Sequence, residues 1–154
     1  VRLAQLSSDH RVLDLFCGIG NFSLPIARRS AHVVGIEGNG GAVVRASNNA
    51  LRNDVQNAEF HQSDLSHSKN LRSWFRQRWD CLLLDPPRAG AAAVIEALPK
   101  HPPPRIVYVS CSPASLARDV RVAVQRHGYT LTHTGVVDMF PHTDQVESIS
   151  VLTL

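Results

Sequence analysis

Short apolar runs alternate along the chain with longer segments in which apolar residues recur every three or four positions. The runs predict β-strands at residues 11–16, 32–37, 58–62, 80–85 and 105–109. The segments between and after them predict helices within residues 18–30, 42–53, 71–78, 90–98 and 115–128, with Trp74 as the anchor of the third. The run at 80–85 is apolar almost throughout, as buried parallel strands are. This order predicts a doubly wound α/β sheet.

Two further strands are expected at residues 129–140 and 146–154, and no helical pattern separates them. Their connection, PHTDQ, is short, and a short connection requires an antiparallel hairpin. We therefore expect a mostly parallel seven-stranded sheet with an antiparallel last strand inserted beside the fifth. This plan is typical of Rossmann-like class I methyltransferases.

Composition narrows the class of protein. The chain has 154 residues, of which 44% are hydrophobic and 19% charged, which predicts one globular domain with its own core. The cysteines, Cys17, Cys81 and Cys111, form no Cys-x-x-Cys pair, so we expect no disulfide framework, no metal site and a reduced, cytoplasmic protein. No apolar run is long enough to span a bilayer, so no membrane partner is expected. The net charge of +3 rests mostly on arginines, which suit phosphate recognition and slightly favour a nucleic-acid partner.

The loop after the first strand, FCGIGNF, contains Gly18 and Gly20. In open α/β sheets, ligands bind at the carboxyl ends of the strands, so this loop is a candidate cofactor site. Ser23 stands where a dinucleotide fingerprint has its third glycine, which counts against NAD. The pair of glycines alone is also compatible with any tight strand–helix turn.

An acidic residue follows or ends each of the next three strands: Glu37, Asp64 and Asp85. Glu37 could accept hydrogen bonds from two ribose hydroxyls, and Asp64 could accept one from an adenine amino group. Together the three acids favour a cationic ligand without phosphate, such as S-adenosylmethionine, over a dinucleotide. Each acid taken alone could instead cap a helix.

The stretch YVSCSPASLARD sets Cys111 at the end of the fifth strand, just ahead of a helix that begins at Pro113 or Ser115. A helix N-terminus favours a thiolate, so Cys111 is a candidate nucleophile. The alternative for any of these cysteines is a small buried hydrophobe, which suits Cys81 within its strand; Cys17 is ambiguous.

Four separated motifs, in order, resemble those of the RNA uracil-C5-methyltransferases: VLDLFCGIGNFSLPIA, LLLDPPRAGA, RIVYVSCSPASLARD and MFPHTDQVES. The resemblance runs from about residue 11 to the end and is closest to the enzymes that act on 23S rRNA, with tRNA as the other substrate class. It implies an enzyme that transfers a methyl group from S-adenosylmethionine to a uridine in RNA and releases S-adenosylhomocysteine as the second product. It also implies that residues 1–154 are a catalytic domain, without the family's amino-terminal RNA-binding domain and the iron–sulfur cluster of some members. We expect a monomer.

The resemblance assigns Cys111 as the nucleophile that adds to uracil C6 and so activates C5 toward methyl transfer. A general base must then remove the C5 proton, and Glu147 takes this role. The predicted topology agrees, because an antiparallel last strand begins at the ligand edge beside the end of the fifth. The alternatives are a solvated Glu147 on an edge strand and His142 as the base.

The resemblance also implies a cofactor site lined by Phe16, Gly18, Asn21, Glu37, Asp64 and Asp85. Arg88 would contact the flipped uridine or a phosphate, or else pair with Asp85. Two other functions stay open. An amino-methyltransferase carries a related Pro-Pro motif, although it normally ends in an aromatic residue where Arg88 stands. A catalytically silent RNA-binding fragment is the other.

Overall fold

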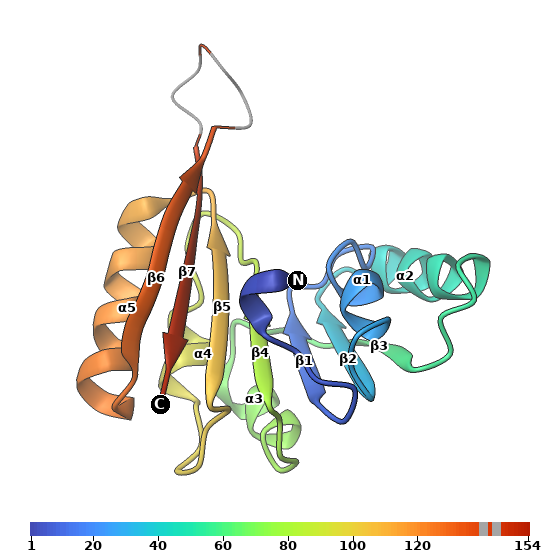
Figure 1. Cartoon of the computed structure of the whole chain (residues 1–154), viewed down its shortest axis with the longest axis horizontal. Helices are drawn as coiled ribbons and strands as arrows, with labels where there is room; N and C mark the ends of the chain where they lie inside the picture. Colours follow the sequence, from blue (N-terminus) through green and yellow to red (C-terminus); the bar gives the residue numbers. More distant parts are fainter. Residues whose placement is uncertain (139–141, 143–145) are drawn as a thin grey trace.

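The computed structural model describes residues 1–138, 142 and 146–154. Within these residues one sheet has the strand order β3-β2-β1-β4-β5-β7-β6 (Figure 1). The strands are β1 (Arg11–Leu15), β2 (His32–Glu37), β3 (Ala58–Gln62), β4 (Cys81–Leu84), β5 (Arg105–Ser110), β6 (Thr130–Val137) and β7 (Glu147–Thr153). The first five are parallel, and β7 runs antiparallel between β5 and β6. The predicted sheet, including the inserted last strand, is confirmed.

Helices cover both faces of the sheet. They are the 3-10 helix η1 (Arg2–Ala4) and the α-helices α1 (Ser23–Ala27), α2 (Gly40–Arg52), α3 (Ser68–Trp74), α4 (Ala92–Glu96) and α5 (Pro113–His127). Residues of η1, α1 and α2 share one hydrophobic core with the sheet, and residues of α3, α4 and α5 share the other. The doubly wound arrangement is therefore confirmed.

The apolar character of β4 follows from its central place in the sheet. Successive side chains of a strand point to opposite faces. Leu82 and Leu84 enter the core with α3–α5, whereas Cys81 and Leu83 enter the core with η1, α1 and α2. All four side chains are buried, so neither face of this strand can accept a polar residue.

The third helix is anchored differently from the prediction. It begins at Ser68, and this phase directs Leu71 and Phe75, one turn apart, into the core as buried residues. Trp74 packs against this core only as a half-buried residue. Trp79 is the buried tryptophan, and its indole N–H donates to the Trp74 carbonyl at 2.8 Å.

Helix α5 begins and ends on clear local signals. The Ser112 side chain caps it by accepting from the Ser115 N–H, and Pro113 occupies the first turn, where no backbone donor is needed. Gly128 ends it in the left-handed conformation, at φ 76°, which a glycine adopts without steric cost. Of the two expected starts, Pro113 and Ser115, the helix has the first, and the expected closure at Gly128 is confirmed.

The β6–β7 hairpin extends beyond the rest of the sheet at the edge where the parallel strands end (Figure 1). Ser110, the last residue of β5, pairs with Ser148 near the start of β7. The Ser148 hydroxyl also donates to the Ser110 carbonyl at 2.9 Å. The first residues of β7 thus lie beside the carboxyl end of β5. Of the predicted connection 141–145, only His142 lies within the described residues.

Candidate active site

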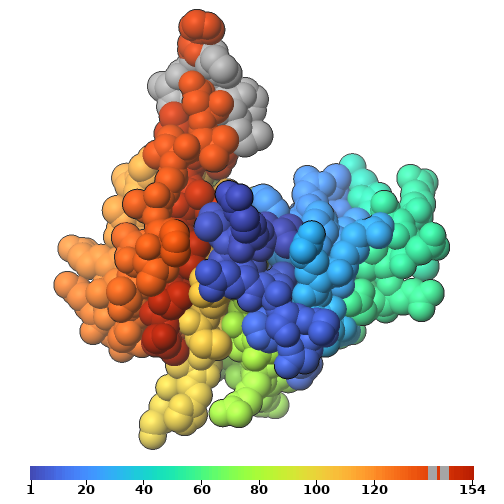
Figure 2. Space-filling view, in the orientation of Figure 1, coloured from blue at the N-terminus to red at the C-terminus, as the bar shows by residue number. Residues whose placement is uncertain are grey.

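A cavity of about 470 Å³ opens at this edge, between the β1–α1 loop and the first residues of β7. In Figure 2 the surface is hollowed between the hairpin and the region of α1. Five predicted site residues line the cavity: Phe16, Gly18, Asn21, Asp85 and Glu147. The fold therefore brings together residues that are as much as 131 positions apart in the sequence (147 − 16).

The β1–α1 loop is shaped by backbone conformations that are rare for most residues. Phe16 has φ 67° and Gly18 has φ 55°. The N–H groups of Phe16 and Cys17 both donate to the Ile36 carbonyl, at 2.9 and 3.1 Å, which folds the loop over the end of β2. A Cβ at Gly18 would meet no atom within 4 Å, so this glycine leaves open space at the cavity wall. A non-glycine residue in this conformation, such as Phe16, is typical of a functional site.

Glu37 connects two loops at the end of β2. One carboxylate oxygen accepts from the Gly18 N–H at 3.1 Å, and the other accepts from the Asn39 N–H at 2.8 Å. A carboxylate has about four acceptor positions, so each oxygen can accept a further hydrogen bond. Glu37 is half-buried next to the cavity loop but is not among the residues that line the cavity, and its role in binding ribose hydroxyls stays a prediction.

Asp64 lies farther out than the other two acids. Its carboxylate is exposed and accepts from the Ser66 N–H at 2.8 Å and from the Ser66 hydroxyl at 2.6 Å. These hydrogen bonds hold the pKa of Asp64 below its ordinary value. Asp64 is not among the residues that line the cavity. Its role in binding adenine stays a prediction.

Two carboxylates face the cavity from different strands. Asp85 follows β4, and Glu147 opens β7. Burial raises the pKa of Asp85 to about 6, and the negative charge of Glu147 adds to this effect. The charges of the two acids therefore interact across the space in which a ligand would lie.

Cys111 directly follows the Ser110–Ser148 pair, and Glu147 directly precedes it on the partner strand. The two residues are thus neighbours across the β5–β7 pair, as the predicted topology requires. Cys111 is half-buried, whereas Cys17 and Cys81 are buried. Burial raises the pKa of both buried thiols, that of Cys81 to about 12, which makes them poor nucleophiles. The buried alternative is confirmed for Cys81, and it also describes Cys17.

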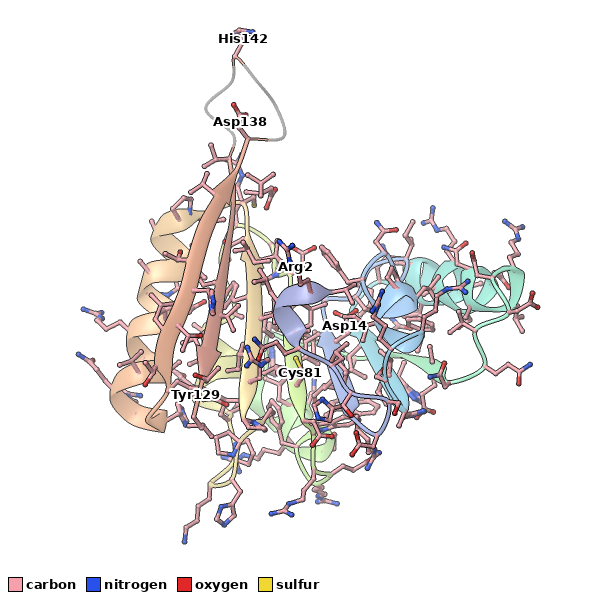
Figure 3. The ribbon with its side chains drawn as sticks, in the orientation of Figure 1. Arg2, Asp14, Cys81, Tyr129, Asp138 and His142 are labelled. Carbon is pink, nitrogen blue, oxygen red and sulfur yellow. The ribbon has the colours of Figure 1, made fainter. Side chains whose placement is uncertain are left out.

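The structure also bears on two alternative roles, Arg88 as the partner of Asp85 and His142 as the general base. Arg88 is exposed, and among the described residues it forms no ion pair with Asp85. Its place at the surface suits a contact with RNA better than a structural pair. His142, the rival base, is exposed at the tip of the hairpin, well away from Asp14 under the cavity loop (Figure 3).

The sequence analysis missed Asp14, a fully buried acid within β1. One of its oxygens accepts from the Ser23 hydroxyl, and the other has no hydrogen-bond partner in the described part of the chain. Burial raises the pKa of Asp14 to about 7, and the charges of Asp85 and Glu37 act in the same direction. The sequence signal that could have indicated this residue is an acid inside an otherwise apolar strand.

The described residues include neither a membrane-spanning helix nor a cluster of metal ligands. None of their helices is long and apolar enough to cross a membrane. No group of three or more His, Cys, Asp or Glu side chains among them could hold a metal ion.

Comparison with known proteins identifies the family. The model of the family described as tRNA (Uracil-5-)-methyltransferase matches residues 2–153. The chain belongs to this family.

A 23S rRNA (uracil(1939)-C(5))-methyltransferase RlmD of Stenotrophomonas maltophilia (strain K279a) is 54% identical over 149 residues, which are 97% of this chain and 34% of that protein. RlmD of Xanthomonas euvesicatoria pv. vesicatoria (strain 85-10) is 54% identical over 151 residues. The chain spans about a third of the length of these relatives.

Solved structures agree with this membership. The Pyrococcus abyssi tRNA (uracil-54, C5)-methyltransferase in complex with S-adenosyl-L-homocysteine superposes with a TM-score of 0.83 at 33% identity. The match covers 99% of this chain and 36% of that one. A precorrin 8w decarboxylase of Methanobacterium thermoautotrophicum reaches a TM-score of 0.80 at 14% identity, which shows the shared fold alone. The expected Rossmann-like class I methyltransferase fold is confirmed.

The buried Asp14 predicts a specific dependence of stability on pH. Its folded pKa of about 7 lies above the ordinary value of 3.8, so stability is lost as the pH rises from that ordinary value through about 7. An Asp14→Asn variant cannot lose this proton. Its free energy of unfolding relative to the wild type should therefore rise by roughly 3–4 kcal/mol between about pH 4 and pH 8.

Urea unfolding at both pH values measures this difference. Asp54→Asn, which removes an exposed carboxylate, is the matched control. An equal difference at the two pH values for Asp14→Asn would show that Asp14 is charged in the folded protein.

Proposed function

We propose that the chain is the catalytic domain of an enzyme that transfers a methyl group from S-adenosylmethionine to C5 of a uridine in RNA. The observation that carries this proposal is the place of Cys111 and Glu147 at the neighbouring ends of β5 and β7, with Glu147 lining the cavity. Within the family, the 54% identity to RlmD favours 23S rRNA over tRNA, and the uridine named in that relative, 1939, is the candidate target. RNA recognition by further parts of the protein is part of this proposal, as is action as a monomer in the cytoplasm.

The cavity suits S-adenosylmethionine in size and in charge. Its volume of about 470 Å³ lies in the range of small-molecule sites. Glu37 retains acceptor positions for the ribose hydroxyls, and the carboxylates of Asp85 and Glu147 attract a positively charged sulfonium. Phe16 supplies an apolar face, and Asn21 supplies an amide. Asp64, farther along the same edge, would accept from the adenine amino group.

The chemistry explains why a thiol and a carboxylate are paired. C5 of uracil is a weak nucleophile. When the Cys111 thiolate adds to C6, the electrons of the C5–C6 double bond move toward C5 and the neighbouring carbonyl oxygen. When bound, S-adenosylmethionine supplies an electrophilic methyl group to that carbon. The Glu147 carboxylate then removes the C5 proton, the C5–C6 double bond re-forms, and the C6–sulfur bond breaks to release the Cys111 thiolate.

Cofactor binding can be tested at Glu37. Glu37→Ala should weaken the binding of S-adenosylhomocysteine by about 1.5–3 kcal/mol, because hydrogen bonds to a charged group are lost. Isothermal titration calorimetry measures the effect. Glu96→Ala, which removes an exposed acid on α4, is the matched control. Wild-type affinity in Glu37→Ala, or tighter binding of NAD by the wild type, would contradict the assignment.

The nucleophile can be tested by covalent trapping. RNA that contains 5-fluorouridine should form a stable adduct with the full-length enzyme, because fluorine cannot leave C5 as a proton does. Cys111→Ala should lose both the adduct and methyl transfer while it still binds S-adenosylhomocysteine. Cys17→Ala and Cys81→Ala should form the adduct. Mapping of the adduct to either of these residues would transfer the nucleophile role to it.

The base can be tested with natural uridine. Glu147→Gln in the full-length enzyme should still add Cys111 to C6 and accept the methyl group, because both steps precede proton removal. Elimination should then stall, since an amide does not take the proton. A methylated RNA–protein adduct should accumulate and survive denaturing gel electrophoresis. His142→Asn, the control, should not accumulate it. Normal turnover by Glu147→Gln, or stalling only in His142→Asn, would make His142 the base.

A further inference from the structure

One face of α5 holds the turn between β4 and α4, residues 85–91. Ser115, Arg118 and Asp119 are three and four positions apart, so they share one side of the helix. This side is polar although its Asp119 is buried. Its contacts with the turn are three: the Ser115 hydroxyl donates to the Arg88 carbonyl at 2.6 Å, Arg118 donates to the Ala89 carbonyl at 2.8 Å, and the Ala91 N–H donates to the Asp119 carboxylate at 2.7 Å.

Asp119 is the centre of this arrangement. Its side chain is 1% exposed. One oxygen accepts from the Tyr108 hydroxyl and from the Ala91 N–H, both at 2.7 Å, and the other accepts from the Arg118 side chain at 2.9 Å. A buried carboxylate is costly unless such donors surround it. Burial and the bond to Asp119 raise the pKa of Tyr108, so its hydroxyl stays a donor.

The turn approaches α5 so closely that only a glycine fits. Gly90 has φ 83°, and a Cβ at this position would lie 2.6 Å from an Arg118 nitrogen and 2.7 Å from an Asp119 oxygen. The preceding Pro86 and Pro87 have no N–H to donate. The turn therefore takes much of its order from α5, through carbonyls that accept from Ser115 and Arg118.

The same contacts reach the segment of the nucleophile. Ser112, the residue after Cys111, donates through its hydroxyl to the Ser115 hydroxyl at 3.1 Å. Ser115 in turn donates to the Arg88 carbonyl. A continuous chain of hydrogen bonds thus connects the residue beside the thiol with the exposed arginine of the turn.

We propose that Asp119 and Arg118 are positioning residues that hold the 85–91 turn against α5, so that Arg88 meets the RNA strand beside Cys111. Neither residue touches the reacting atoms. An arginine in a fixed place can bind a phosphate or the flipped base with two hydrogen bonds, whereas a mobile turn would first have to be ordered. This inference rests on the proposed methylation of uridine. Asp85 directly follows β4, so cofactor binding should depend little on these contacts.

The test uses the full-length protein and the variant Arg118→Met. Asp119→Asn is the more obvious change but could unfold the protein, whereas the Arg118 side chain is 44% exposed. Amide hydrogen exchange in residues 88–91 should become faster. Adduct formation with 5-fluorouridine RNA should slow by about tenfold or more, since a small displacement of a positioning group has large effects on rate. The affinity for S-adenosylhomocysteine should stay within about twofold. Arg118→Lys keeps a charged donor, so its adduct rate should lie between those of the wild type and Arg118→Met. The control Arg121→Met should match the wild type.

Each other result has a distinct meaning. Unchanged exchange in Arg118→Met would show that this residue does not order the turn. Faster exchange with a normal adduct rate would show a purely structural contact, and an equal loss of cofactor affinity would show a collapsed cavity; both would overturn the inference. If the wild type formed no adduct, the proposed function would be refuted and the inference with it, while the exchange data would still show whether Arg118 orders the turn.

Discussion

The antiparallel pairing of β7 with β5 is the constraint on which the site depends. Parallel strands bring only their carboxyl ends to the ligand edge, so a residue at the start of a strand normally lies at the opposite edge. Because β7 runs the other way, its first residue, Glu147, lies beside the end of β5 and therefore beside Cys111. A shift of the register by one residue would exchange the two faces of β7, and the Ser148 hydroxyl would lose its hydrogen bond to the Ser110 carbonyl.

Negative charge is concentrated around the cavity. Asp85 and Glu147 line it, Glu37 holds its glycine loop, and Asp14 is buried in the adjoining strand β1. Burial and mutual repulsion raise the pKa values of Asp14 and Asp85, so the free site holds carboxylates in an unfavourable state. A bound cation would relieve this repulsion, which is a physical reason for the site to prefer a sulfonium to a phosphate. Perturbed acids of this kind are typical of functional sites.

The molecule separates binding from chemistry along its edge. The loop after β1 and the end of β2 form the side on which the cofactor is proposed to bind, whereas the end of β5 and the start of β7 carry the proposed reacting groups. The turn at 85–91 belongs to both sides, because Asp85 faces the cavity while Arg88 faces solvent. Its attachment to α5 explains how one short segment can serve both sides without regular structure of its own.

Local pattern alone determined the strands, because burial on both faces leaves a continuous apolar run and burial on one face leaves an alternation. The bounds of β2 and β3 came out as predicted, and so did the topology and five of the residues that line the cavity, since the ends of parallel strands must meet at one edge. Only the tertiary structure decided the burial of Asp14, the outward position of Asp64 and the contacts of Asp119 with a turn 28 residues away. These features depend on which distant groups come within hydrogen-bond distance, and periodicity along the chain carries no record of such contacts.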